Sequence, residues 1–265
     1  MAALGKAVYR MGSWIRGTGQ ALDRLGSRLQ GQYAYQESLS KHRTLMELFE
    51  KTPDIAKNAF IAPSAAVIGD VKVGPASSIW YGCVVRGDVN SITIGSGTNI
   101  QDNTLVHVAK TNISGNVMPT TIGSRVTIGH NAVLHGCTIE DDAFVGMGAT
   151  LLDGVHVEKH AMVGAGSLVK QNTRIPSGEV WAGNPAKLLR KLTEEEKAFF
   201  IKSAEDYMKL AETHAEENSK TFHEIEADKV RRKKWEQQND DYDSHIGVFR
   251  EKAPAHVAMR DPTLV

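Results

Sequence analysis

The chain has 265 residues with 31 basic and 31 acidic side chains, so its bulk charge indicates neither a nucleic acid nor another polyanion as partner. Its two cysteines, Cys83 and Cys137, are too few for a disulfide scaffold and favour a reducing compartment. No apolar run reaches the ~18–20 residues that cross a bilayer. Aromatic residues make up 6% of the chain while glycines number 24, which is typical of a turn-rich β architecture with a core of small aliphatic side chains.

Residues 1–30 form a basic segment that is poor in acids. Asp23 is the single acid, and apolar residues recur at helical spacing; the basic residues are Lys6, Arg10, Arg16, Arg24 and Arg28, and the apolar ones are Val8, Met11, Ile15, Leu22, Leu25 and Leu29. This composition is typical of a mitochondrial presequence, of a helix on an anionic membrane or a partner protein, or of a loose basic arm. Five glycines between Gly12 and Gly31 argue against one long helix. A second short helix is predicted within Ser40–Lys51, where Leu45, Leu48 and Phe49 share a face.

From residue 61 to residue 175 an aliphatic residue returns at nearly every sixth position. These anchors are Ile61, Val67, Val73, Ile79, Val85, Ile94, Ile100, Val106, Ile122, Ile128, Leu134, Ile139, Val145, Leu151, Val157, Val163, Val169 and Ile175. A helix repeats every 3.6 residues and a sheet alternates every two, so neither explains the pattern. Self-similarity at a short fixed period indicates a solenoid.

Six residues suffice for one short strand and one turn, so three hexads make a triangular coil whose anchors point inward. Stacked coils pair through parallel strands ~4.8 Å apart, and roughly six coils fit the span. The pattern resembles the left-handed parallel β-helix of hexapeptide-repeat proteins, which implies that handedness and assembly as a trimer. We expect four segments: a basic amphipathic N-terminal segment over 1–52, the mainly β domain over 53–190, C-terminal α-helices over 191–237 and an extended tail over 238–265.

Three histidines occupy defined positions in this repeat. His107 and His135 each follow an anchor by one residue, and leaving out an irregular stretch at 112–121 reduces their separation from 28 residues to 18, one full coil. Both are therefore predicted on one side of the prism, one above the other, whereas His130 follows its anchor by two residues and lies on another side. Two histidines from one chain and His130 from a neighbour would then form a metal site with an open position, the arrangement of a catalytic zinc. The remaining seven histidines share no such position and are interpreted as exposed or structural groups.

Arg86, in Val85-Arg86-Gly87-Asp88, and Gln101, in Ile100-Gln101-Asp102, also follow an anchor by one residue. One interpretation is an Arg86–Asp102 ion pair between subunits, with Asp88 orienting the planar guanidinium group. The other is a ladder of solvated polar side chains.

Arg86-Gly87-Asp88, Gln101-Asp102 and the three histidines together resemble the γ-class carbonic anhydrases over residues 60–210. The whole chain is most similar to the γ-carbonic-anhydrase subunits of mitochondrial respiratory complex I in plants and algae. The resemblance implies that His107, His130 and His135 hold Zn²⁺, which lowers the pKa of water toward ~7 for the hydration of CO₂ to bicarbonate. It implies catalytic roles for Gln101, Arg86 and Tyr207, and substrate contacts for these three with Gly87, Asp88 and Asp102.

Two departures from the resembled family keep other functions open. Val89 follows Arg-Gly-Asp where active members carry Glu, and residues 108–121 contain no Asp or Glu where those members carry an acidic proton-shuttle loop. A zinc carbonic anhydrase is one function, with CO₂ or bicarbonate binding as its weaker form. A catalytically inactive structural or assembly subunit of complex I is the second. A hexapeptide acyltransferase is the third, because Asn184-Pro185-Ala186-Lys187 is shared with that class.

The C-terminal region is predicted to be helical. Thr193-Glu194-Glu195-Glu196 is a capping box, and an apolar stripe follows it; its members are Phe200, Ala204, Tyr207, Met208, Ala211 and Ala215. Tyr207 is the polar-tipped member and is interpreted either as a site residue or as plain packing. A second helix is expected over Ile225–Gln237.

The resemblance also implies a location and partners. The location is the matrix side of the mitochondrial inner membrane, peripherally bound. The partners are homologous subunits in a homo- or heterotrimer and membrane-arm subunits of complex I, with membrane-surface contact through residues 1–30.

Overall fold

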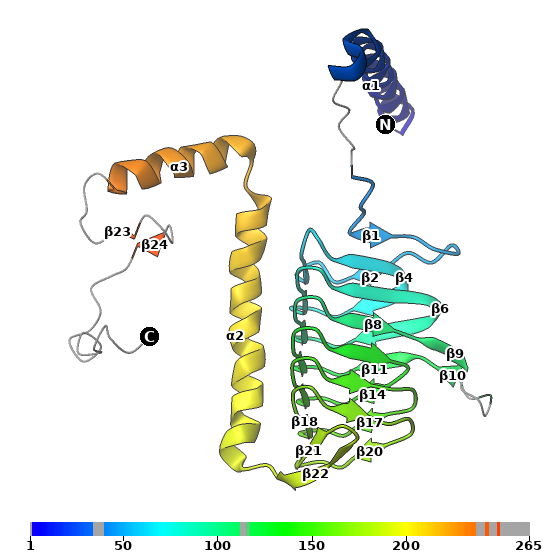
Figure 1. Ribbon diagram of the computed structural model, residues 1–265, viewed down its shortest axis with the longest axis vertical. Coiled ribbons are helices and arrows are strands. Elements are labelled where there is room, and N and C mark those ends of the chain that lie inside the picture. Colours follow the sequence, from blue (N-terminus) through cyan, green and yellow to red (C-terminus); the bar gives the residue numbers. More distant parts are fainter. Residues whose placement is uncertain are drawn as a thin grey trace. The chain divides into compact units, whose positions relative to one another are not determined.

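The computed structural model describes residues 2–33, 40–111, 115, 117–236, 242–243 and 248–249. The chain divides into two compact units, residues 1–42 and residues 43–265. Figure 1 shows the second unit as a stack of short strands with a long helix alongside it.

The first unit contains one continuous helix, α1 (Ala2–Gln30), and the short 3₁₀ turn η1 (Gly31–Tyr33). The predicted interruption by glycines is wrong. Glycine weakens a helix by about 1 kcal/mol relative to alanine without preventing helical dihedral angles. The whole predicted apolar stripe of this helix, from Val8 to Leu29, is exposed. Among the described helices, none combines the length and the apolar character that a membrane span needs.

The second unit is a parallel β-helix of about seven coils, one more than expected, with three flat sides. On the first side, which we call the covered side, all strands are parallel except the last, which turns back and closes the stack. In stacking order they are β3 (Phe60–Ile61), β5 (Ser78–Ile79), β7 (Asn99–Ile100), β12 (Thr127–Ile128), β15 (Phe144–Val145), β18 (Met162–Val163), β21 (Glu179–Gly183) and β22 (Ala186–Lys191).

The other two sides share the long strands β4 (Ala66–Val73) and β6 (Val84–Ile94), which bend around a corner. The histidine side holds the beginnings of β4 and β6 together with β1 (Leu45–Met46), β8 (Leu105–His107), β13 (Val133–His135), β16 (Thr150–Leu151) and β19 (Leu168–Val169). The third side holds their ends together with β2 (Asp54–Ile55), β11 (Thr120–Ile122), β14 (Thr138–Ile139), β17 (His156–Val157) and β20 (Arg174–Ile175).

The predicted anchors form the core of this prism. Every anchor from Val67 to Ile175 is at most 2% exposed, and Ile61 is partly buried. Burying one such side chain contributes about 1.5–3 kcal/mol. The six-residue period therefore predicted the inward positions correctly because three anchors per coil fill a narrow prism.

The helix predicted within Ser40–Lys51 is wrong. Leu45 pairs in parallel register with Val67, and Phe49 and Glu50 adopt left-handed φ angles of 51° and 62°. Helical spacing over so few residues is weak support for a helix, and this segment instead adds a strand to the first coil.

The irregular stretch between the first two site histidines is a hairpin that projects from the β-helix (Figure 1). Its strands are β9 (Ala109–Thr111) and β10 (Val117–Met118), so it begins and ends three residues earlier than the predicted 112–121. The hydroxyl group of Thr120 donates to the carbonyl oxygen of His107 at 2.5 Å, where the chain re-enters the coil.

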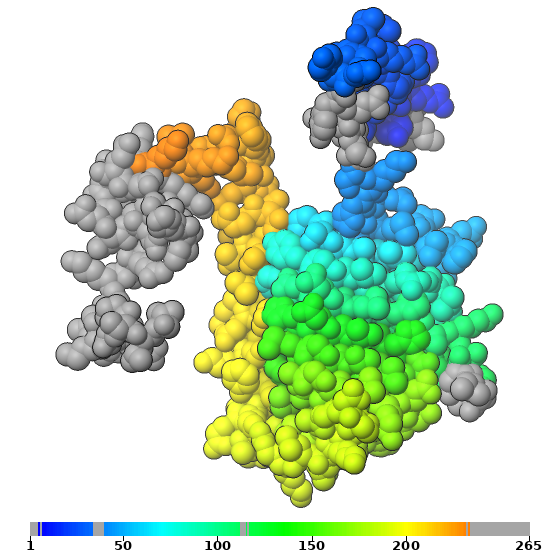
Figure 2. Space-filling model, in the orientation of Figure 1, coloured from blue at the N-terminus to red at the C-terminus, as the bar shows by residue number. Residues whose placement is uncertain are grey.

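Two helices follow the β-helix. The long helix α2 (Glu194–Ser219) begins with the predicted capping box between Thr193 and Glu196 and packs along the covered side, as Figures 1 and 2 show. The second helix, α3 (Phe222–Glu236), starts three residues before its predicted beginning. Of the tail over 238–265, only the two-residue strands β23 (Tyr242–Asp243) and β24 (Val248–Phe249) are described, and the rest lies outside the described residues.

Candidate metal centre

His107 and His135 lie one above the other on the histidine side. They are direct partners in the parallel register of β8 and β13, and their ring centroids are 5.0 Å apart. Arg86 pairs in the same register with His107. The structure therefore confirms the predicted stacking, and Arg86, His107 and His135 form what we call the ladder.

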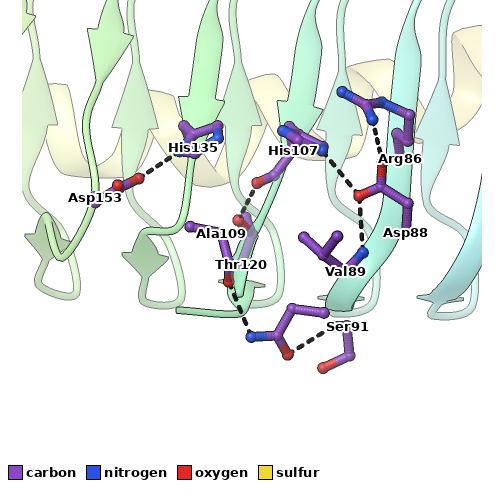
Figure 3. Close-up of polar contacts among 10 residues, drawn as sticks. Arg86, Asp88, Val89, Ser91, His107, Ala109, Thr120, His135 and Asp153 are labelled. Atoms are coloured by element: carbon purple, nitrogen blue, oxygen red, sulfur yellow. Dashed lines mark hydrogen bonds and ion pairs between the residues drawn. The ribbon is translucent and has the colours of Figure 1, made fainter. Parts of the chain in front are cut away.

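Asp88 joins two members of the ladder (Figure 3). One of its carboxylate oxygens contacts Nε2 of His107 at 3.0 Å, and the other contacts the guanidinium group of Arg86. Burial alone would raise the pKa of Asp88, but hydrogen bonds from His107 and from the backbone N–H of Val89 outweigh burial and hold that pKa below its usual value. Asp88 thus orients Arg86 as predicted, and the two form an ion pair within the described residues of one chain.

His135 has a carboxylate partner of its own. Its Nδ1 atom contacts Asp153, which comes from the next coil (Figure 3). Asp153 was not predicted from the sequence. It follows His135 by 18 residues, the length of one coil, so the spacing was an available signal.

His130 lies at the corner between the covered side and the histidine side, just beyond β12. Its Nδ1 atom contacts Asp102 at 2.9 Å, and the other oxygen of Asp102 accepts a hydrogen bond from the backbone N–H of Tyr81 at 3.0 Å. The side chains of His130 and Asp102 are about one-third exposed, at 35% and 36%. We call Tyr81, Asp102 and His130 the corner stack.

Gln101 is buried on the covered side, 6% exposed. Its amide donates to Oδ1 of Asn99 at 3.1 Å, and the amide of Asn99 donates to the hydroxyl oxygen of Thr127 at 3.0 Å. Asn99 and Thr127 were not predicted from the sequence. The two residues pair across adjacent coils, and each directly precedes an anchor. The six-residue register could therefore have predicted their contact.

Two more predicted residues have packing explanations. A β-carbon on Gly87 would lie 2.4 Å from the carbonyl oxygen of Asp70, so the close approach of neighbouring backbones requires glycine there. Tyr207 packs edge-on against Trp80 with ring centroids 5.6 Å apart. Burial, and secondarily the charge of Asp102, raises the pKa of the Tyr207 hydroxyl group.

The donor set fits a zinc-like divalent cation. Three imidazoles each contact a carboxylate through one ring nitrogen, an arrangement that fixes the tautomer of metal-binding histidines. Within the described residues of one chain, no group of three or more His, Cys, Asp or Glu side chains is placed to hold a metal ion. The ladder and the corner stack are thus separate donor groups.

Comparison with known proteins identifies the family of this chain. The family model for the gamma carbonic anhydrase 1, mitochondrial C-terminal domain matches residues 197–261, and a bacterial transferase hexapeptide model of six repeats matches residues 136–171. The chain is 67% identical over 254 residues to gamma carbonic anhydrase 2, mitochondrial, from Arabidopsis thaliana, covering 96% of this chain and 91% of that protein. The chain belongs to the gamma carbonic anhydrase family.

Other similar proteins cover a smaller share of the chain. A probable carbonic anhydrase from Methanocaldococcus jannaschii is 46% identical over 159 residues, which cover 60% of this chain and 96% of that protein. A hexapeptide transferase family protein from Anaplasma phagocytophilum has a crystal structure with a TM-score of 0.60 and 47% identity, covering 64% of this chain and 97% of that one. Both proteins therefore match about three-fifths of this chain and nearly the whole of their own length.

Proposed function

We propose that the chain is a gamma carbonic anhydrase subunit that forms zinc sites between the subunits of a trimer, for reversible CO₂ hydration or for binding CO₂ and bicarbonate. The observation that carries this proposal is the separation of the donors. His107 and His135 converge on one side of the prism, whereas His130 lies at a corner. A neighbouring chain placed against the histidine side would supply the third imidazole, and a threefold arrangement repeats that contact three times.

An apolar stripe on the histidine side supports a neighbour at that place. Val84, Leu105 and Val133 pair with one another across β6, β8 and β13, and they point outward because the anchors beside them point inward. All three are half-buried in the single chain. Covering this stripe would remove apolar surface from water next to the ladder.

The residues around the site have distinct proposed roles. Zn²⁺ bound by the three histidines would supply the Lewis acidity that lowers the pKa of water. Gln101 would position the reacting water or CO₂, because Asn99 already occupies its amide group and leaves its carbonyl oxygen to accept. Arg86, oriented by Asp88, would attract bicarbonate or pair with Asp102 of the neighbour. Tyr207 is the third proposed catalytic residue.

A second function, as a structural subunit of respiratory complex I on the matrix side of the inner membrane, is favoured by a specific observation. Val89, which is 51% exposed beside Asp88, occupies the position where the resemblance implies a glutamate. Residues 108–121, which include the hairpin following His107, contain no Asp or Glu. Both proton acceptors that the resemblance implies are therefore missing from these positions. Three Arabidopsis relatives that are 64–67% identical carry the word mitochondrial in their names. The basic helix α1 would contact the membrane surface or a membrane-arm subunit, and deletion of residues 1–40 without any effect on assembly would remove that role.

Complementation between two variants tests the shared site. His130→Ala retains the ladder, and the double variant His107→Ala/His135→Ala retains the corner stack. Each should bind no zinc alone, whereas co-expression should restore one complete site per mixed trimer, about one quarter of all interfaces under random mixing. Zinc content of the purified trimers measures this. Zinc retained by either variant alone, or no recovery in the mixture, would contradict the shared site.

Stopped-flow CO₂ hydration by the zinc-loaded trimer separates catalysis from the structural role. Catalysis predicts a rate above that of His130→Ala, and a further rise of about 100-fold in Val89→Glu, the low end of what a positioned proton acceptor contributes. A wild-type rate equal to that of His130→Ala, with zinc bound, would leave only the structural function.

A further inference from the structure

A cluster of rings fills the space between α2 and the first coils of the β-helix, and the proposed chemistry uses only one of them. Its rings are Phe60, Trp80, Tyr81, Tyr207 and His214. His214 lies edge-on to Trp80 with ring centroids 4.8 Å apart, and Trp80 is 4% exposed. The cluster therefore attaches the middle of α2 firmly to the covered side.

One ring of this cluster continues directly into the corner stack. Tyr81, Asp102 and His130 each lie two residues after an anchor, and those anchors pair in register on three successive coils. The backbone N–H of Tyr81 donates to Asp102 at 3.0 Å, and Asp102 contacts His130 at 2.9 Å. Both oxygens of the Asp102 carboxylate are thus occupied, one by the tyrosine and one by the histidine.

The other end of Tyr81 is held by α2. Its hydroxyl group contacts Nδ1 of His214 at 3.0 Å and accepts a hydrogen bond from the side-chain amide of Asn218 at 3.0 Å. That same amide donates to the backbone carbonyl oxygen of His214 at 2.7 Å, one helical turn earlier. Two residues of α2, 133 and 137 positions away in the sequence, therefore fix the tyrosine ring.

We propose that Tyr81 is a positioning residue for His130, held by His214 and Asn218, so that docking of α2 sets the orientation of the imidazole that one subunit contributes to its neighbour's metal site. The inference rests on the proposed function for its consequence, and on the contacts above for its geometry. Fixing the tyrosine ring fixes its backbone amide, and that amide determines where the carboxylate of Asp102 can meet His130. The ladder has no such connection in the described structure, because backbone pairing holds it.

The test compares Tyr81→Phe and His214→Ala with Phe200→Leu. Phe200 stacks on Phe144 with ring centroids 5.0 Å apart, so its replacement loosens α2 at a different contact and serves as the control. Zinc affinity of the trimer is measured by competition with a chelator. We expect both test variants to weaken zinc binding by about three- to tenfold, less than the 10–100-fold typical of removing a direct partner of a metal-bound histidine. Phe200→Leu should lower the thermal midpoint and leave zinc affinity unchanged.

A metal-free readout separates this inference from the proposed function. NMR of chelator-treated protein with isotopically labelled histidine reports the His130 ring, which is assigned by comparison with His130→Ala. We expect Tyr81→Phe and His214→Ala to shift the His130 signal and to leave the His107 signal in place. An unchanged His130 signal in Tyr81→Phe would overturn the positioning role. Wild-type trimer without zinc would overturn the proposed function alone, because the His130 signal would still decide the role of Tyr81.

Discussion

The ladder and the corner stack carry the same kind of histidine–carboxylate pair but are built by different means. In the ladder, Arg86, His107 and His135 lie within or directly beside strands, and hydrogen bonds between parallel backbones fix their register. His130 lies beyond the end of its strand. Its backbone still bonds to a neighbouring coil, because its carbonyl oxygen accepts from the backbone N–H of Gly148 at 2.8 Å, and its side chain contacts Asp102. Its position depends on Asp102, on Tyr81 and through them on α2.

The half-site formed by His107 and His135 is placed by the repeat, whereas the half-site formed by His130 is placed by the repeat and also connected through Tyr81 to α2. The repeat places identical positions of successive coils about one strand spacing apart, which suits two imidazoles meeting one ion. The corner must instead present a single imidazole outward. A site between subunits needs both arrangements, because one chain would supply two imidazoles and its neighbour would supply one.

The largest expected effect comes from emptying the core under either half-site. Leu134 precedes His135 and Ile128 lies two residues before His130, and both side chains are 0% exposed. Leu134→Ala and Ile128→Ala should each lower the free energy of unfolding by about 2–5 kcal/mol, because the rigid coil cannot close the cavity. Urea denaturation measures this. Leu188→Ala, at a residue 53% exposed, is the control and should change stability by less than about 0.5 kcal/mol. A loss below that value at Leu134 would mean that the coil collapses around the cavity.

Much of this fold could be predicted because one short period governs it. The anchors determine which residues point inward, and the residue after each anchor inherits a defined outward position, so the stacking of His107 and His135 followed from counting. The hairpin β9–β10 was located only to within three residues, because an insertion carries no period of its own.

What the repeat does not encode was predicted less well. The strand at Leu45 was mistaken for part of a helix because its pairing partner, Val67, lies outside any local window. The partners of the site residues, such as Asp153 and Asn99, depend on which side chains meet across coils. The contact between Tyr81 and His214 joins residues 133 positions apart, and no sequence spacing indicates it.

Removing the carboxylates compares the two half-sites directly. Asp88→Asn and Asp102→Asn should each weaken zinc binding by about 10–100-fold, because the partner histidine loses its orienting acceptor. Competition with a chelator on the trimer measures both values. Asp206→Asn, an exposed position on α2, should bind zinc as the wild type does. Equal binding by all three variants would show that neither carboxylate orients its histidine.

A third corner, remote from the proposed site residues, provides a pH test of the same coil geometry. Asp142 is 3% exposed and is paired with Arg125, which is 42% exposed. Burial would raise the pKa of Asp142, but hydrogen bonds and charge from Arg125 outweigh it and hold that pKa below its usual value. The pair therefore stabilises the fold fully above the ordinary Asp pKa of about 3.9 and loses this contribution as pH falls through the lower folded-state value.

Replacing that carboxylate should reproduce the acid effect at neutral pH. Asp142→Asn should cost about 1–2 kcal/mol near pH 7, less than a fully buried pair because Arg125 is partly solvated. The difference from wild type should shrink as the pH falls below about 3.9. Urea denaturation at both pH values measures it. A difference that stays constant with pH would assign the effect to packing rather than to charge.

The smallest expected effect comes from loosening the first turn of α2, which tests whether the ladder is independent of that helix. The hydroxyl oxygen of Thr193 accepts from the backbone N–H of Glu196 at 3.3 Å, while the backbone N–H of Thr193 donates to the Glu196 carboxylate at 2.9 Å. Thr193→Ala removes only the first bond and should cost about 0.5–1 kcal/mol, the low end for an N-cap. Hydrogen exchange should speed up in the first turn of α2 and leave the amides of β8 and β13 unchanged, because backbone pairing within the coils holds the ladder. Faster exchange in β8 or β13 would show that the ladder also depends on α2, and the distinction between the two half-sites would fail.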